Sequence, residues 1–172
     1  HPPFVNKTLM NKVEERIIKR TIKGIQKTDL TYKGFIFFGL INVGGDPYVI
    51  EYNCRMGDPE TEVVFPRLKS DLVELMQAMH EGRLAEIEIE EDTRAAATVI
   101  LVSGGYPEVY EKGKMITGLE EVEGSIVFHA GTKKMGNQIV SNGGRVLAVT
   151  SYGKDFREAL ELSYKNAEKI KF

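Results

Sequence analysis

The sequence has little of several features that would restrict the class of the protein. It contains 172 residues and one cysteine, Cys54, so an internal disulfide is excluded, which suits a reducing compartment. Its 23 basic and 25 acidic residues give no basic excess of the kind that marks nucleic-acid or anionic-membrane binding. No stretch reaches the roughly 18 apolar residues of a membrane helix. We therefore expect no nucleic-acid partner, no membrane partner and a cytoplasmic location.

What is present fits an ordinary globular chain. Hydrophobic residues make up 42% and charged residues 28%, and this length can bury a core without metal or disulfide. Length alone allows one domain or two small ones. The chain begins with His1-Pro2-Pro3 rather than Met and shows no signal peptide. We expect it to be a piece of a longer protein.

The periodicity of apolar residues divides the chain into two parts. A three- and four-residue repeat predicts helices over 8–26 and 71–82, and apolar runs predict antiparallel strands over 34–42 and 48–53. An acidic segment over 86–92 then marks a boundary. Beyond it, short β-type runs and a final amphipathic stretch predict four strands and a closing helix, with the strands at 95–102, 126–130, 138–140 and 145–150. The expected fold class is α+β, with domains 1–93 and 94–172.

The most informative segment follows the second predicted strand. Alternation places Val49, Glu51 and Asn53 on one face of that strand, so a carboxylate and an amide oxygen project side by side. These are ligands that Mg²⁺ accepts, with phosphate and water supplying the rest. Arg55, if the strand continues, extends the same face with a planar guanidinium suited to carboxylate or phosphate oxygens. Gly57 begins a turn whose backbone N–H groups can face an anion.

Plain structural roles compete with these interpretations. Glu51 and Asn53 could form a solvated face, and Arg55 could pair with Asp58 or Glu60. Cys54, on the opposite face of the strand, is expected to be buried and inert. No Walker loop, no Gly-x-Ser-x-Gly elbow and no zinc spacing is present.

The longer pattern resembles a known family. A strand ending in Glu-x-Asn-x-Arg after a glycine-rich hairpin resembles the metal-binding end of ATP-grasp ligases, and the Gly-Asp-Pro-Glu continuation is similar to the glycinamide ribonucleotide synthetase (phosphoribosylamine–glycine ligase) family. The similarity covers essentially the whole chain. The matching segments are 32–34, 49–62, 66–72, 103–107, 110–113, 116–119, 128–132 and 142–147.

The resemblance implies a reaction and a set of roles. The family joins glycine to 5-phosphoribosylamine with ATP as co-substrate, through a glycyl phosphate, in purine biosynthesis. Glu51 and Asn53 match its ligands for Mg²⁺ or Mn²⁺. Arg55 is expected to hold the transferring phosphate or the glycine carboxylate, Asp58 the glycine ammonium, and Gly57 the nucleotide side of the site. The expected fold is the C-terminal portion of an ATP-grasp domain over 1–93, followed by the small β-rich domain.

The chain also departs from the family pattern. Many ATP-grasp enzymes carry a further metal-binding acid twelve residues before the glutamate, where this chain has Gly39. The family's N-terminal domain, adenine-binding region and lid are not matched, so we expect the chain to be inactive by itself. We also expect the full-length enzyme to be monomeric. A non-catalytic binding module and another ATP-grasp carboxylate–amine ligase remain alternatives. The segment 103–107 is either a phosphate cradle or a plain turn, and Arg145 either belongs to a hairpin turn or faces substrate.

Overall fold

The computed structural model describes residues 5–172 and divides the chain into two compact units, so the unusual start at His1-Pro2-Pro3 lies outside the described residues. The first unit runs to Gly57 and also contains Leu72–Glu88. The second unit contains Asp58–Asp71 and Ile89–Phe172. The chain therefore passes from one unit to the other three times. The predicted domain division at 93/94 stays a prediction.

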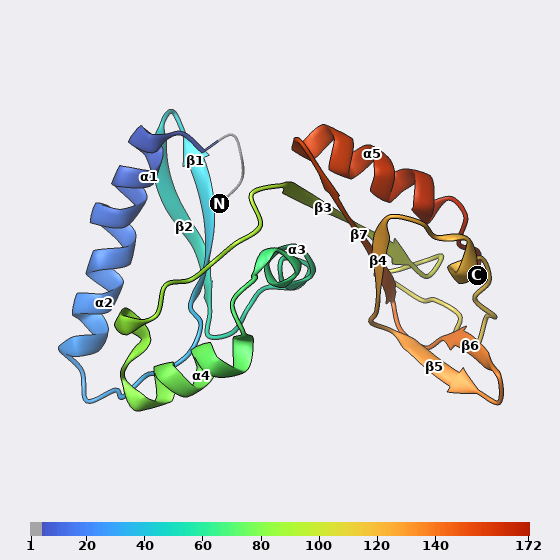
Figure 1. Ribbon diagram of the computed structural model, residues 1–172, viewed down its shortest axis with the longest axis horizontal. Helices are drawn as coiled ribbons and strands as arrows, with labels where there is room; N and C mark the ends of the chain where they lie inside the picture. Colours follow the sequence, from blue (N-terminus) through green and yellow to red (C-terminus); the bar gives the residue numbers. More distant parts are fainter. Residues whose placement is uncertain (1–4) are drawn as a thin grey trace. The chain divides into compact units, whose positions relative to one another are not determined.

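A long N-terminal helix forms one side of the first unit (Figure 1). It consists of α1 (Lys7–Val13), a π-helical segment (Glu14–Ile18) and α2 (Lys19–Gln26), which confirms the helix expected over 8–26. Its first turn is capped by Asn6, whose side-chain oxygen accepts the N–H of Leu9 at 2.9 Å. An Asn at this position satisfies one of the N–H groups that a helix start leaves unpaired.

A two-stranded antiparallel hairpin lies beside this helix (Figure 1). Strand β1 (Phe37–Val43) pairs with β2 (Asp46–Asn53) through a two-residue turn, Gly44-Gly45. Both glycines have positive φ, 60° and 88°, the conformation that such tight hairpin turns require. Lys12 and Arg16 on the helix pair with Asp46 at 2.8 and 2.7 Å, which fixes the turn end of the hairpin to the helix. Their hydrogen bonds, that of Lys12 foremost, lower the pKa of Asp46.

The first unit is completed by α4 (Leu72–Glu81) and a 3₁₀ turn (Leu84–Glu86). The helix ends at Gly82, where φ is +77°, as a helix-terminating glycine allows. The first unit buries few apolar side chains, and those below 10% exposure among its described residues are Val13, Ile17, Leu75 and Ala78.

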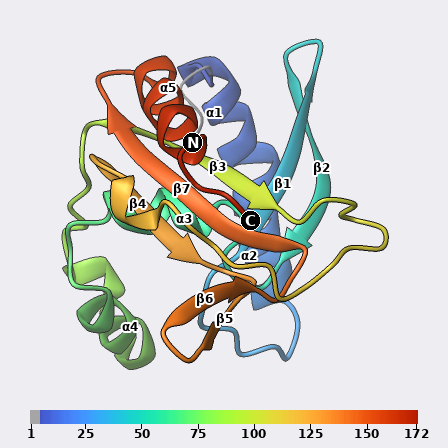
Figure 2. The same cartoon turned by 90° about the vertical axis from the view of Figure 1, so that its right-hand side faces the viewer.

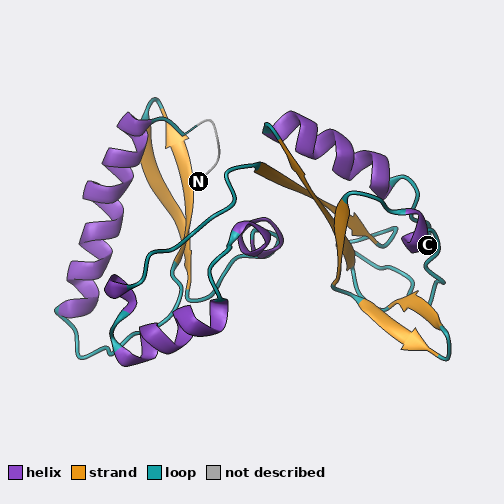
Figure 3. Cartoon of the chain, in the orientation of Figure 1, coloured by secondary structure: helices purple, strands orange, loops and turns teal. Residues whose placement is uncertain are grey.

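The second unit is built on a three-stranded antiparallel sheet in the order β3-β7-β4 (Figure 2). Its strands are β3 (Ala95–Val102), β4 (Ser125–His129) and β7 (Arg145–Gly153). A separate hairpin joins β5 (Thr132–Met135) to β6 (Gln138–Ser141) (Figure 3). A 3₁₀ turn, Leu119–Glu121, precedes β4. The β-rich second half predicted from the sequence is confirmed.

Two helices pack against the sheet of the second unit. Helix α5 (Phe156–Ala167) contacts β7 and β3, and the short α3 (Thr61–Arg67) contacts the same two strands. Asp155 caps α5 by accepting the N–H groups of Arg157 and Glu158 at 2.9 and 3.0 Å, and these bonds, with that of Glu158 the larger, lower the pKa of Asp155. The core beneath α5 consists of Ile116, Val146, Leu147, Val149, Ala167 and Ile170.

No helix within residues 5–172 is both long and apolar enough to cross a membrane.

Candidate active site

Glu51 and Asn53 lie side by side at the end of β2, as the sequence predicts. The amide nitrogen of Asn53 donates to Oε1 of Glu51 at 3.1 Å, so the carboxylate and the amide are immediate neighbours. A bulge at Ile50 interrupts the strict alternation expected over 48–53, because Gly39 pairs with Glu51 while Leu40 pairs with Val49. The shared face therefore holds for the two candidate ligands but does not run on to Val49.

Gly39 gives Glu51 the space it occupies. The two residues are direct partners across the hairpin, and a Cβ added at Gly39 would lie 2.8 Å from Cγ of Glu51. Real Cβ atoms do not approach so closely. The position where many ATP-grasp enzymes carry an acid is thus filled here by the side chain of Glu51 leaning over a glycine.

The donor set fits a divalent cation that receives most of its ligands from elsewhere. Among residues 5–172, no lysine or arginine forms an ion pair with Glu51, so its charge is open to a cation. The same residues contain no cluster of three or more histidine, cysteine or acidic side chains that could hold a metal alone. A carboxylate with one amide is a partial oxygen site, and Mg²⁺ commonly completes such a site with phosphate and water.

The next candidate residues leave the strand. Nη1 of Arg55 lies 3.2 Å from the carbonyl of Met56, and its side chain is exposed. Gly57 is buried and is the last residue of the first segment of the first unit, whereas Asp58 is the first residue of the second unit. The predicted site residues are therefore divided between the two units, with Glu51, Asn53, Arg55 and Gly57 in the first and Asp58 in the second. Cys54, expected to be buried, is instead exposed, because the strand has ended at Asn53.

Asp58 forms an ion pair that sequence spacing could not reveal. Nη2 of Arg145 lies 3.2 Å from Oδ2 of Asp58, and Nη1 donates to the Asp58 carbonyl at 3.3 Å. Both side chains are about half exposed, at 42% for Arg145 and 54% for Asp58. The interpretation that Arg145 belongs to a hairpin turn is wrong, because β6 pairs with β5 whereas β7 pairs with β3 and β4. Arg145 instead contacts the predicted glycine-binding residue 87 positions away.

The segment 103–107 is folded against the loop that precedes Arg145. Ser103, nearly fully buried, donates from its backbone N–H to Gly144 and from its hydroxyl to Gly143, each at 2.8 Å. A Cβ on Gly144 would lie 2.1 Å from the ring of Tyr106, so only glycine permits this contact. The backbone of this segment is thus held as a packed turn against the two residues that precede Arg145.

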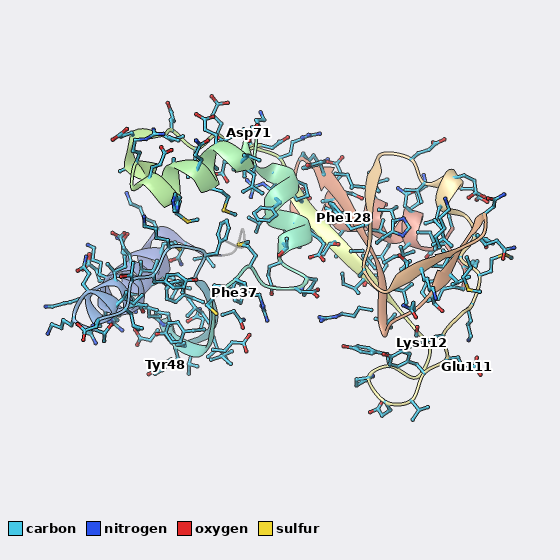
Figure 4. The ribbon with its side chains drawn as sticks, turned by 90° about the horizontal axis from the view of Figure 1, so that it is seen from below. Phe37, Tyr48, Asp71, Glu111, Lys112 and Phe128 are labelled. Atoms are coloured by element: carbon cyan, nitrogen blue, oxygen red, sulfur yellow. The ribbon has the colours of Figure 1, made fainter. Side chains whose placement is uncertain are left out.

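An open cavity of about 520 Å³ borders α3 in the second unit. Phe128 of β4 and side chains of α3 line it (Figure 4). His129, whose Nδ1 lies 3.1 Å from the Thr132 hydroxyl, lines it as well. Oε2 of Glu62 is buried in this region and has no hydrogen-bond partner among the described residues. Sequence reasoning missed Glu62, because nothing in its local pattern distinguishes it from an exposed helical acid.

Two profiles of one protein family match this chain. The family profile described as "Phosphoribosylglycinamide synthetase, ATP-grasp (A) domain" matches residues 1–61, and the one described as "Phosphoribosylglycinamide synthetase, C domain" matches residues 96–172. The chain belongs to the phosphoribosylglycinamide synthetase family. The resemblance inferred from the motifs is confirmed.

Curated relatives agree with this family. Phosphoribosylamine–glycine ligases from Vibrio cholerae and Chlorobaculum tepidum are 46% and 44% identical to this chain over 171 and 173 residues, covering 98% and 99% of it. The chain spans only 40% and 41% of their lengths.

Solved structures confirm the ATP-grasp type of fold. The crystal structure of phosphoribosylamine–glycine ligase from Thermotoga maritima matches the whole chain with a TM-score of 0.85 and 36% identity, and the match covers 42% of that protein. N5-carboxyaminoimidazole ribonucleotide synthetase from the same organism matches with a TM-score of 0.64 at 16% identity, which shows the fold alone.

Proposed function

We propose that the full-length protein containing this chain is an ATP-dependent ligase that joins glycine to 5-phosphoribosylamine in purine biosynthesis. The observation that carries this proposal is the adjacency of Glu51 and Asn53 on a strand of a chain whose relatives are phosphoribosylamine–glycine ligases. A cytoplasmic, monomeric enzyme is part of the same proposal.

The proposed chemistry brings together two anions, the glycine carboxylate and the terminal phosphate of ATP. Bound Mg²⁺ or Mn²⁺ would neutralise phosphate charge as the phosphoryl group transfers to glycine. In this proposal Glu51 and Asn53 hold the cation, and Gly57 offers backbone to the nucleotide. Arg55 contributes positive charge near the transferring phosphate or the glycine carboxylate.

Glycine is assigned to the turn that begins the second unit. A carboxylate is the natural partner for its ammonium group, and Asp58 is half exposed, so a small amine can reach it. Arg145 holds Asp58 in one orientation through two contacts, one to its carboxylate and one to its carbonyl. Phosphoribosylamine then displaces phosphate from the glycyl phosphate, giving the amide product, ADP and phosphate.

The test uses the full-length protein of the gene that encodes this chain. Release of ADP is measured as a function of ATP, glycine and phosphoribosylamine in the wild type, Glu51→Ala and Glu88→Ala. Glu88 is a matched control, because it is an exposed acid of the same unit outside the site. We expect dependence on all three substrates, loss of turnover in Glu51→Ala and normal turnover in Glu88→Ala.

Two further measurements separate the roles. Binding of Mn²⁺, followed by electron paramagnetic resonance with ATP present, is expected to weaken in Glu51→Ala. The KM for glycine is expected to rise in Asp58→Asn with little change in the KM for ATP. A wild type without glycine-dependent turnover would reject the ligase and favour a binding module. Unchanged Mn²⁺ binding in Glu51→Ala would reject the metal assignment.

A further inference from the structure

Helix α3 contains a proline that leaves one of its carbonyls without a helical partner. In an α-helix the N–H of a residue bonds to the carbonyl four residues earlier, and Pro66 has no N–H to offer to the carbonyl of Glu62. The hydroxyl of Thr150 on β7 donates to that carbonyl at 3.0 Å. Thr150 is fully buried, and its own oxygen lies 2.9 Å from the hydroxyl of Thr98. The missing helical bond is therefore replaced by a bond from the sheet.

The same strand holds the segment at two more points. The hydroxyl of Tyr152 donates to the carbonyl of Pro66, one of the terminal carbonyls that a helix cannot satisfy internally. Arg145, at the start of β7, pairs with Asp58 and donates to its carbonyl. Three side chains of β7 thus reach both the turn before α3 and α3 itself.

A bulge brings these three side chains to one face. Leu101 of β3 pairs with Leu147, but Val102 pairs with Arg145, so Val146 is an extra residue in β7. Such a bulge shifts the alternation of side chains by one, which puts Arg145 in step with Thr150 and Tyr152. Without it, Arg145 would belong to the opposite face of the strand.

That opposite face of β7 serves α5. Ser151 contacts the hydroxyl of Ser163 on α5 at 2.9 Å, and Ser163 also donates to the carbonyl of Ala97 at 3.0 Å. Ser163, like Thr150, is fully buried and hydrogen-bonded to a backbone carbonyl. The two hydroxyls therefore match in burial and bonding, but only Thr150 reaches the segment that carries Asp58.

We propose that Thr150 is a positioning residue for glycine: its hydroxyl fixes the start of α3 and, through it, the turn Asp58–Glu60. This inference rests on the proposed assignment of Asp58 to the glycine ammonium. Thr150 touches no substrate. Loss of its hydroxyl frees the Glu62 carbonyl, lets the first turn of α3 move, and displaces Asp58 relative to Arg145.

The test measures steady-state kinetics of the full-length protein with Thr150→Val, Thr150→Ser and Ser163→Ala. Valine keeps the shape of threonine without the hydroxyl, and serine keeps the hydroxyl. We expect Thr150→Val to raise the KM for glycine about tenfold with the KM for ATP nearly unchanged, because the Glu62 carbonyl loses the hydrogen bond that holds the turn carrying Asp58. Thr150→Ser is expected to restore the KM for glycine.

Ser163→Ala separates positioning from stability. It is expected to lower the melting temperature as Thr150→Val does, while leaving the KM for glycine at the wild-type value. An equal rise in Ser163→Ala, or no rise in Thr150→Val, would overturn the inference while leaving the ligase function intact. If Thr150→Val does not fold, Tyr152→Phe removes only the second hydroxyl and is expected to raise the KM for glycine about threefold; an unchanged KM there overturns the inference. A wild type without glycine-dependent turnover overturns the proposed function and this inference with it.

Discussion

The two units support the predicted site residues that each contains in different ways. In the first unit, Glu51 and Asn53 stand on a two-stranded hairpin whose neighbouring side chain Ile50 is 67% exposed. In the second, Arg145 belongs to β7, the central strand of the sheet, where Leu147 is fully buried. A two-stranded hairpin by itself is only marginally stable in water. A central strand with both faces covered is stabilised by its neighbouring strands and by the helices packed on it.

In the proposed reaction, the metal and glycine would therefore be held by elements that differ in burial. The candidate metal ligands lie on the less buried element, which depends on a few contacts such as those from the N-terminal helix to Asp46. The turn proposed to bind glycine, and the helix that follows it, are held by three side chains of β7.

Hydrogen exchange should show the largest contrast between the units. We expect the amides in the middle of β7 to exchange about a thousandfold more slowly than those of β1 and β2 in the 172-residue chain, because local opening is easiest where little apolar surface is buried. Exchange followed by NMR at neutral pH measures this directly. Equal protection of the hairpin and β7 would contradict the comparison.

Truncation of one side chain in each unit should give a smaller but clear difference in the free energy of unfolding. Leu147→Ala removes a fully buried side chain from the core of the second unit and is expected to lower the free energy of unfolding by about 2–5 kcal/mol. Ile50→Ala, at an exposed position of the hairpin, is expected to change it by less than about 0.5 kcal/mol. Urea denaturation of both variants provides the measurement. A larger loss in Ile50→Ala would mean that the hairpin is covered in solution.

Local sequence patterns predicted most of the elements, though not α3 or β5, and the adjacency of the candidate ligands. The Gly44-Gly45 turn and the flanking apolar runs determine the hairpin, and a spacing of two places Glu51 beside Asn53. The family motif added their proposed roles. These features depend on residues that are close in sequence, where backbone periodicity sets the geometry.

Long-range partners could not be predicted in this way. Nothing near Asp58 indicates that Arg145 pairs with it, because the contact depends on a bulge at Val146 that only the pairing of β3 with β7 reveals. The role of Pro66 is likewise hidden, since its missing N–H matters only once Thr150 lies opposite the Glu62 carbonyl. The exposure of Cys54 depends on where the strand ends, and single-sequence patterns fix such ends poorly.

Two glycines offer a finer comparison of how tightly each unit is packed. Gly118 in the second unit has a φ of +82°, and a Cβ there would lie 2.1 Å from the carbonyl oxygen of Lys169. Gly39 in the first unit would place its Cβ 2.8 Å from Cγ of Glu51, a side chain that can rotate away. We expect Gly118→Ala to destabilise by about 1–3 kcal/mol. Gly39→Ala should destabilise less but weaken Mn²⁺ binding. Thermal unfolding and Mn²⁺ titration distinguish the two, and a larger loss of stability in Gly39→Ala would contradict this ranking.

The smallest expected effect concerns the acid dependence of stability. The pKa values of Asp46 in the first unit and Asp155 in the second are both lowered, so each carboxylate favours the folded state when ionised. That contribution is complete above the ordinary carboxyl pKa of about 4 and is lost as the pH falls through the lowered value. The causes differ, because Asp46 depends first on Lys12, whereas Asp155 depends first on the N–H of Glu158.

This difference in cause can be separated with salt. Asp46→Asn and Asp155→Asn should each flatten the loss of stability between about pH 5 and pH 2. Because salt screens exposed charge pairs, 1 M NaCl should remove most of the difference between wild type and Asp46→Asn at neutral pH. The cap at Asp155 is a bond to backbone, and asparagine retains it, so Asp155→Asn should stay close to wild type at neutral pH with or without salt. Urea midpoints across pH and salt supply the test. A salt-insensitive Asp46→Asn would show that the hairpin is held to the helix by packing and not by charge.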